Sequence, residues 1–338
     1  MKSKKRPLHK SFYSFNAETN FELGCMMGAA FKQDAKNGLK RSSQSRDWER
    51  RNRVSDKYLD FTENEFPSYV EELRGFAEGS GVSFADLWPM VIGSDLSQDK
   101  SEKCTAIVTN DGSLIGSTED FDASVKDEIY IVQKTIRDIT VFEFYYSYSL
   151  GGESISINSN GIVQLTNSLV HTDHQVGIPR NVISRWLSET AEPVNDFEKL
   201  NKLTRASGYS HTITSLGGPV WNIEMTSKNL VVTKNKTPFI HTNHYLSELA
   251  RIQSEEYKEG VGIGTYERYE SAIAQAKKKM TEGDLRELLS DNSLGKEISI
   301  FNERTIARIL INLKTQKAFV WMLREKELGW VEYELDFL

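Results

Sequence analysis

The sequence predicts an α+β protein with stacked antiparallel sheets, and three observations support this fold class. The first 103 residues carry mostly helical, charged patterns. From residue 104 onward, short runs rich in β-branched and aromatic residues alternate with turn signals such as Asn160-Gly161 and Gly217-Gly218. Two helical patterns interrupt these runs, and such an arrangement is typical of antiparallel sheets covered by helices. Periodicity alone does not give the number of layers.

Two helices are predicted in detail within the first third of the chain. The apolar segment Phe21–Phe31 predicts a helix that ends near Gly38. A second helix carries an apolar face and ends at Gly79 and Gly81. The residues of that face are Tyr69, Val70, Leu73 and Phe76. After it, Ser83 and Asp86 have the spacing of a capping box, which predicts a further helix through Leu87, Trp88 and Val91.

The remainder of the chain predicts strands and two helices. The expected strands are Thr105–Val108, Ser113–Gly116, Ile129–Val132, Thr140–Tyr146, Ser154–Ile157, Gly161–Leu165, Ile213–Ser215, Val220–Glu224, Leu230–Val232, Pro238–His241, Ile306–Leu313 and Ala318–Leu323. The expected helices are Arg180–Thr190 and Tyr266–Met280.

Composition limits the classes of partner and the compartment. The 338 residues suffice for one large domain or two ordinary ones, and 38% hydrophobic with 27% charged residues suits a globular protein with a core. A net charge of −6 argues against a nucleic-acid partner. The basic stretches Lys2–Arg6 and Lys40–Arg53 are short, and acids are mixed into the second, which favours a solvated helix face.

No apolar run reaches the roughly 18–20 residues that a membrane span needs, and no apolar segment follows the basic N-terminus. We therefore expect no membrane contact, no secretory signal and a cytoplasmic protein. Two cysteines, Cys25 and Cys104, are too few for a disulfide scaffold, and no ligand spacing predicts a metal. No other cofactor is indicated.

Cys104 opens the first predicted β-hairpin, and two interpretations fit it. A cut between Lys103 and Cys104 would expose an N-terminal residue that carries both a nucleophilic thiol and an α-amine, which can act as its base. The unperturbed pKa of such an amine, about 7.7–8.0, suits proton transfer near neutral pH. In the alternative, Cys104 is a small residue packed in the core of a strand.

Several segments in order resemble the isopenicillin N acyltransferase family, the acyl-CoA:6-aminopenicillanate acyltransferase-like, self-processing C45 peptidases. The resemblance covers most of the chain. It rests on the following segments: Phe21-Glu22-Leu23-Gly24 with Gly28, residues 69–87, Cys104-Thr105, Gly161 with Asn167-Ser168-Leu169, Gly177-Ile178-Pro179, and His241-Thr242-Asn243-His244.

This resemblance implies an N-terminal nucleophile hydrolase with an αββα sandwich. It implies a cut before Cys104, a small subunit of residues 1–103 that stays bound, and a catalytic domain of residues 104–338. The sequence departs from the family in two places. Lys103 replaces the usual glycine before the cysteine, and Thr118-Glu119-Asp120 replaces a segment that usually reads Asn-Trp-Asp. A side chain at Lys103 restricts the backbone and can slow or prevent cleavage.

The resemblance also implies roles for individual residues. Cys104 is the nucleophile, Asp120 is a carboxylate that orders the amine or the substrate, and Asn243 is the oxyanion donor. Asn167 binds the α-amine or the substrate carbonyl, with a turn role as the alternative. Arg304 matches a basic site residue loosely, with Arg308 close by and a surface arginine as the alternative. Arg268 is expected to be structural.

Alternative roles stay open for several of these residues. Asp120 and its neighbours Glu119 and Asp122 are turn or surface acids if the resemblance does not extend to them, and Asn243 is then a loop residue. His241 and His244 are expected to have supporting roles. The aromatic residues around Phe142–Tyr146 belong to an acyl pocket or to the core.

The predicted function is that of a cysteine amidohydrolase or acyltransferase, acting on linear amides or thioesters through a thioester acyl-enzyme. The expected partner is a small-molecule amide or an acyl-CoA-type substrate, and cleaved subunits would remain associated. No glycine-rich phosphate loop supports CoA binding. Two alternatives remain: a hydrolase whose cysteine stays internal, and an inactive binding protein on the same fold. The identity of the substrate does not follow from the family.

Overall fold

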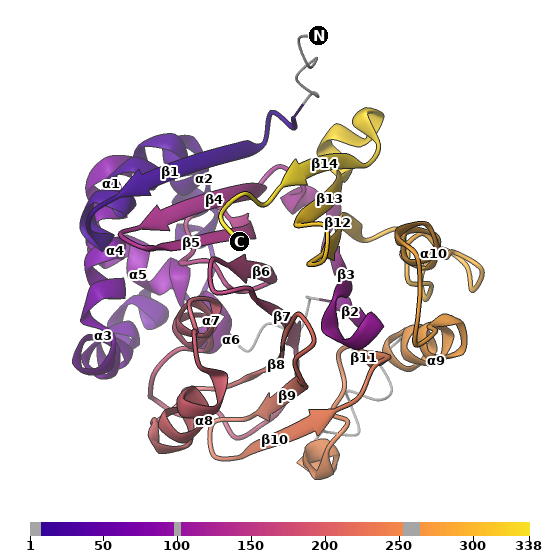
Figure 1. The fold of residues 1–338 in the computed structure, drawn as a ribbon. Coiled ribbons are helices and arrows are strands. Elements are labelled where there is room, and N and C mark those ends of the chain that lie inside the picture. The colour runs from indigo at the N-terminus through magenta and orange to yellow at the C-terminus, as the bar shows by residue number, and fades with distance from the viewer. Residues whose placement is uncertain (1–7, 98–102, 253–263) are drawn as a thin grey trace, which may run out of the picture.

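The computed structural model describes residues 8–97, 103–252 and 264–338, and it consists of two β-sheets flanked by helices (Figure 1). The predicted α+β class with stacked sheets is confirmed. The basic stretch Lys2–Arg6 lies outside the described residues. Within the described ranges, none of the helices has the length and apolar character needed to cross a membrane.

The first third of the chain is helical except for one strand that was not expected. Its elements are β1 (Phe12–Ala17), α1 (Asn20–Ala30), α2 (Lys32–Ser43), α3 (Trp48–Glu65), α4 (Pro67–Ser80), α5 (Phe84–Val91) and α6 (Gly93–Ser97). The predicted ends at Gly38 and Gly79 are wrong. Gly38 lies inside α2, where its missing side chain makes room for the Tyr148 ring, and Gly79 lies inside α4 against the backbone of α1. Gly81 ends α4 with a φ of 69°, as predicted.

The larger sheet has eight strands in the order β1-β4-β5-β6-β7-β8-β9-β10. Apart from β1, these strands are β4 (Ile129–Ile136), β5 (Ile139–Tyr146), β6 (Ile155–Asn158), β7 (Ile162–Ser168), β8 (Tyr209–Ser215), β9 (Val220–Met225) and β10 (Leu230–Asn235). Strand β1 pairs in parallel with β4, and the other neighbours are antiparallel. The N-terminal third therefore contributes an edge strand to this sheet.

The smaller sheet has six strands in the order β11-β2-β3-β12-β13-β14, all antiparallel. They are β2 (Lys103–Thr109), β3 (Leu114–Asp120), β11 (Phe239–His241), β12 (Thr305–Asn312), β13 (Lys317–Met322) and β14 (Val331–Glu334). Every predicted strand overlaps an observed one, and β14 is a further strand that was not expected.

Four helices complete the fold: α7 (Arg180–Ser188), α8 (Pro193–Lys202), α9 (Thr265–Gln275) and α10 (Glu282–Leu288). Two of them, α8 and α10, were not predicted. Figure 1 shows α1–α8 beside the larger sheet and α9 with α10 beyond the smaller one.

Three apolar clusters show how the layers pack. One cluster joins the N-terminal helices and α7 to the larger sheet, a second fills the space between the sheets, and a third joins α9 and α10 to the smaller sheet. Alternate residues of β2 divide between the last two clusters, since Ala106 and Val108 face the other sheet whereas Ile107 faces the helices. Cys104 shares the face of Ala106.

Helices α1 and α4 cross without side chains at their closest points. A Cβ atom on Gly24 would lie 1.9 Å from the carbonyl oxygen of Glu72, and one on Gly28 would lie 2.2 Å from that of Phe76. These nearest atoms belong to the main chain of α4, which cannot shift without moving the whole helix. The glycines in Phe21–Gly24 and at Gly28 are therefore explained by the packing of two helices.

We expect Gly24→Ala to destabilise the fold by roughly 3 kcal/mol, because the two helices must separate to admit the methyl group. Gly283→Ala is the matched control, since a Cβ there meets only Thr281 Oγ1, at 3.5 Å. The free energy of unfolding of that variant should exceed the wild-type value by no more than about 1 kcal/mol. Chemical denaturation measures both, and equal losses would contradict this account of the helix crossing.

Candidate active site

Cys104 lies where the two sheets approach each other. It is the second residue of β2, it pairs with Glu119 of β3, and its side chain points toward the larger sheet. Only 4% of its surface is exposed. The Sγ atom lies 3.5 Å from the main-chain oxygen of Thr166 on β7. Cys104 is therefore buried between the two sheets, at the end of the β2–β3 hairpin that lies away from its turn.

Two side-chain amides converge on the sulfur. Asn167 Nδ2 is 3.1 Å from Cys104 Sγ and 3.3 Å from the main-chain oxygen of the same residue. Asn243 Nδ2 is 3.4 Å from Sγ. The expected proximity of Asn167 and Asn243 to Cys104 is thus present in the structure, with one amide supplied by β7 and the other by the loop after β11.

Asn243 is held from several directions. Its Oδ1 accepts hydrogen bonds from the main-chain N–H of Cys104, at 2.9 Å, and from Arg268 Nη2, at 2.7 Å. Its Nδ2 donates to the main-chain oxygen of Ser168 at 3.1 Å. Its own N–H donates to Thr265 Oγ1 at 2.8 Å. This set of bonds fixes which way the amide faces, with the oxygen toward the cysteine nitrogen and the NH₂ group toward the sulfur.

The loop that carries Asn243 is anchored by charged and polar groups at both ends. Glu224 of β9 accepts hydrogen bonds from the N–H groups of Leu246 and Ser247, at 2.7 and 2.9 Å, and lies 3.0 Å from His241 Nε2. His244 Nδ1 lies 3.1 Å from the hydroxyls of Thr242 and Thr265. Burial lowers the pKa of His244 to about 4, so its ring is neutral near pH 7. Both histidines support the loop and neither contacts the sulfur.

Asp120 and Arg304 lie on the other side of the β2–β3 hairpin. Asp120 is buried and accepts hydrogen bonds from Thr305 Oγ1, at 2.7 Å, and Asn302 Nδ2, at 3.0 Å. Burial raises its pKa, and the charges of Arg268 and Arg304 oppose that rise. Arg304 is half-buried, and its carbonyl oxygen accepts from the N–H of Phe121 at 2.9 Å. Asp120 pairs with Lys103, so it lies beside the predicted cleavage point rather than beside the thiol.

Two charged residues of the site escaped sequence reasoning. Arg268, expected to be structural, donates to Asn243 and also to Thr105 Oγ1, at 3.3 Å, from a fully buried position. Thr265 and Arg268 are three residues apart, so the first turn of α9 presents both to the Asn243 loop. Glu119 is expected only to neighbour Asp120, yet strand alternation places it on the face of Cys104.

The uncut chain keeps Cys104 protonated. Burial raises the pKa of its thiol to about 12, and the charge of Glu119 adds to the rise, while hydrogen bonds from Asn243 and the Ser168 main chain oppose it. Reactive thiols need thiolate character. The two amides and the Thr166 oxygen that contact Sγ provide no proton acceptor of suitable basicity. A base must therefore come from elsewhere, and the freed α-amine would supply one.

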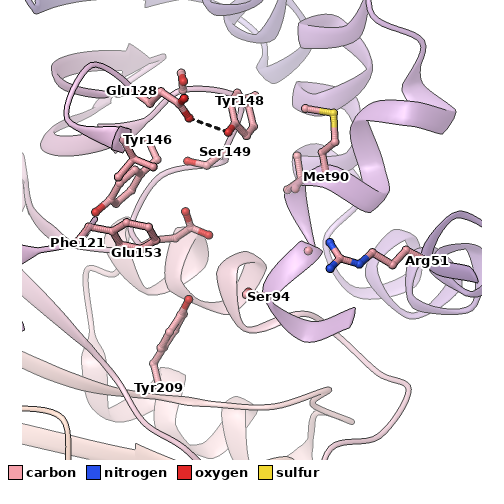
Figure 2. A pocket seen from close by; sticks show the side chains of 14 residues that line it. Arg51, Met90, Ser94, Phe121, Glu128, Tyr146, Tyr148, Ser149, Glu153 and Tyr209 are labelled. Atoms are coloured by element: carbon pink, nitrogen blue, oxygen red, sulfur yellow. Dashed lines mark hydrogen bonds between the residues drawn. The ribbon is translucent and has the colours of Figure 1, made fainter. Parts of the chain in front are cut away.

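A pocket opens next to this site, between the N-terminal helices and the segment after β5 (Figure 2). Phe121 and Tyr146 form one wall, and Tyr146 Oη donates to Glu119 Oε1 at 2.8 Å, which connects the pocket to the residue opposite Cys104. In Figure 2, Arg51 faces the cavity from the opposite wall and the Glu153 carboxylate points into it. The volume accessible to water is about 290 Å³, enough for a small molecule. In the described part of the chain, no three histidine, cysteine or acidic side chains are grouped to hold a metal ion.

Comparisons with known proteins find a similar sequence and similar structures. A Drosophila melanogaster beta-alanyl-dopamine/carcinine hydrolase is 23% identical over 317 residues, covering 82% of each chain. A conjugated bile acid hydrolase variant from Clostridium perfringens is similar in structure with a TM-score of 0.47 and 11% identity, covering 69% of this chain and 92% of that one. For penicillin V acylase from Agrobacterium tumefaciens the TM-score is 0.39 at 9% identity, covering 65% and 83%.

A family-level match carries more weight than the single relatives do. Residues 107–322 match the pattern of the acyl-coenzyme A:6-aminopenicillanic acid acyl-transferase family. This range is more than half of the chain, and it contains Asp120, Asn167, Asn243, Arg268 and Arg304. It begins three residues after Cys104. The chain therefore belongs to the acyl-coenzyme A:6-aminopenicillanic acid acyl-transferase family.

Proposed function

We propose that the protein is a self-processing N-terminal nucleophile enzyme that hydrolyses linear amides through a thioester on Cys104. The observation that carries the proposal is the convergence of Asn167 and Asn243 on Cys104, with Asn243 Oδ1 also bonded to the cysteine nitrogen. One side-chain amide thus contacts both the nucleophilic atom and the nitrogen that cleavage would free.

Cleavage between Lys103 and Cys104 would begin with attack of Sγ on the Lys103 carbonyl carbon, and the thiol proton would pass to the amide nitrogen of Cys104. The peptide C–N bond breaks, its nitrogen becomes the α-amine of Cys104, and a thioester forms between Lys103 and the sulfur. Water then releases residues 1–103 as a separate chain. That chain would stay bound, because β1 pairs with β4 and the helices α1–α6 share one apolar cluster with the larger sheet.

Turnover repeats the same chemistry on an external amide. The α-amine takes the thiol proton as Sγ attacks the carbonyl, and the amides of Asn167 and Asn243 donate to the oxyanion. The amine then gives its proton to the leaving nitrogen as the C–N bond breaks. Water hydrolyses the remaining thioester and restores the thiol. Asp120, with Arg268 and Arg304 around it, would hold the ammonium form of the α-amine at the new chain end.

Two observations favour this proposal over a hydrolase with an internal cysteine. Burial raises the pKa of the thiol in the uncut chain to about 12, and its contacts lack the base that repeated turnover needs, whereas cleavage is a single event for each chain. The Drosophila melanogaster relative acts, by its name, on beta-alanyl-dopamine and carcinine, which supports hydrolysis of linear amides here. Acyl transfer to an amine instead of water uses the same thioester.

Trapping the thioester tests the proposal. We expect acid quenching during turnover of an acyl p-nitroanilide to give a large chain heavier by the acyl mass, with the added mass on the N-terminal peptide that begins at Cys104. Hydroxylamine should remove it, because thioesters are cleaved by hydroxylamine at neutral pH. An adduct on any other residue, or turnover without an adduct under single-turnover conditions, would refute the thioester route.

A further inference from the structure

We propose that Glu119 is a specificity residue that binds a cationic amino group on the acyl part of the substrate, one or two carbons from the carbonyl attacked by Cys104. This proposal rests on the proposed amide hydrolysis and adds a substrate class to it. The class is that of short aminoacyl amides.

The position of Glu119 carries the first step of the argument. Cys104 and Glu119 are direct partners in the antiparallel pair β2–β3, so their side chains leave the hairpin on one face. The Cβ atoms of such partners lie about 4.5–5.5 Å apart. A substrate carbonyl bonded to Sγ is therefore close to the carboxylate. An ammonium group on the first or second carbon beyond that carbonyl falls within ion-pair distance of it.

The carboxylate is fixed in place by its neighbours. Tyr146 Oη donates to Oε1 at 2.8 Å, and Ser154 Oγ donates to Oε2. Only 5% of Glu119 is exposed, and its partner Tyr146 is one of the residues that line the pocket. A carboxylate held by two hydroxyl groups in a buried position loses little further entropy when a ligand binds, so it is preorganised for a cation.

The surroundings also suit a cation. The Glu153 carboxylate points into the same pocket, and the rings of Phe121 and Tyr146 form one wall. Aromatic faces attract ammonium groups. Arg51 is the cation that faces the pocket from the opposite side, and it is bonded to Asp47 at 2.8 Å. An anionic acyl group would approach Glu119 and Glu153 at an electrostatic cost.

The charge of Glu119 also affects the thiol. Burial is the main cause of the raised pKa of the Cys104 thiol, and the Glu119 carboxylate beside it adds to the rise because it opposes formation of the thiolate. A bound ammonium group offsets the negative charge when the substrate is in place. Cationic substrates would then be favoured in reaction as well as in binding, which a purely structural carboxylate would not produce.

The test compares two acyl groups of nearly equal shape on the matured protein. We expect the wild type to hydrolyse β-alanyl p-nitroanilide with a kcat/KM at least about 30-fold above that of propionyl p-nitroanilide, which lacks the amine. Glu119→Gln should remove most of that preference, through a lower kcat/KM with the β-alanyl compound. Glu334→Gln, at an exposed strand position, is the control for loss of one carboxylate and should keep the preference.

A second measurement works without turnover. β-Alaninamide, at matched ionic strength, should slow the alkylation of Cys104 by iodoacetamide more than propionamide does, in the wild type but not in Glu119→Gln. Cys25 on α1 serves as the internal reference. If Glu119→Gln does not fold, Tyr146→Phe retains the charge but frees the carboxylate, and a several-fold smaller preference is expected.

The outcomes separate the two proposals. Equal effects on both compounds in either measurement, or an unchanged preference in Glu119→Gln, would overturn the role of Glu119. Selective protection by β-alaninamide without hydrolysis of either anilide would support the binding site and refute the proposed hydrolysis.

Discussion

Cys104→Ala is expected to give a single uncut chain and to reduce amide turnover by about 10,000-fold or more, since no other group in the site can take the place of the sulfur. The side chain is small and buried between two amides, so alanine removes the reacting atom and two weak hydrogen bonds. We expect little loss of folding stability. Intact mass spectrometry of the denatured protein detects the cleavage, and an assay with an acyl p-nitroanilide measures the turnover.

Cys25→Ala is the matched control for this experiment. Cys25 lies half-buried on α1, and its removal should leave both cleavage and turnover at the wild-type level. Two wild-type fragments that break between Lys103 and Cys104, beside an intact Cys104→Ala chain, would establish self-processing. A cut alanine variant would show that another agent cleaves the chain. An uncut but active wild type would favour an internal-cysteine hydrolase.

The sequence predicted the strands that carry the site because their signals are local. The hairpin formed by β2 and β3, the strand that ends at Asn167 and the short β11 all have β-rich runs bounded by turn residues. Strand β1 has a comparable run, Phe12-Tyr13-Ser14-Phe15, but it pairs with β4, more than 100 residues away. Nothing in its own neighbourhood indicates that pairing, and the helical segments around it dominated the prediction.

The errors within helices have a similar origin. Glycine is common at helix ends, yet α2 continues through Gly38. The residue is a glycine there because the Tyr148 ring occupies the space that a side chain would need. Tyr148 comes from the segment after β5, so this contact exists only in the folded protein. Helix α10, in contrast, carries a local signal that was overlooked, a capping box between Thr281 and Asp284.

The site residues also fall into two groups: those that a local motif predicts and those whose role depends on tertiary packing. Local motifs predict Cys104, Asn167 and Asn243 as site residues, and the structure brings them together. The contribution of Arg268 depends on how α9 docks against the Asn243 loop, which no local pattern encodes. Glu119 could have been found from the sequence, because a hairpin that pairs residue 104 with residue 119 places both on one face. What was missing was the register of the hairpin.

Asn243→Asp is expected to reduce kcat by about 100–1000-fold with a much smaller change in KM, because it removes the donor that the proposed mechanism assigns to the oxyanion. Aspartate keeps the shape and the oxygen that accepts from the Cys104 N–H and from Arg268. It loses the NH₂ group that contacts Sγ and the Ser168 carbonyl. The new oxygen also places negative charge near the thiol, which further opposes the thiolate. Self-cleavage should slow as well, since attack by the same sulfur places negative charge on the carbonyl oxygen of Lys103.

A matched Asn→Asp change away from the site is the control for Asn243→Asp. Asn235→Asp on β10 introduces the same charge away from the site and should leave both rates unchanged. Arg268 can pair with the new carboxylate, so Asn243→Asp should keep its thermal midpoint within a few degrees of the wild type. A variant that retains kcat but raises KM would mean that Asn243 binds the substrate without acting on the oxyanion. The oxyanion role would then pass to Asn167, whose Nδ2 is the closer donor to the sulfur at 3.1 Å.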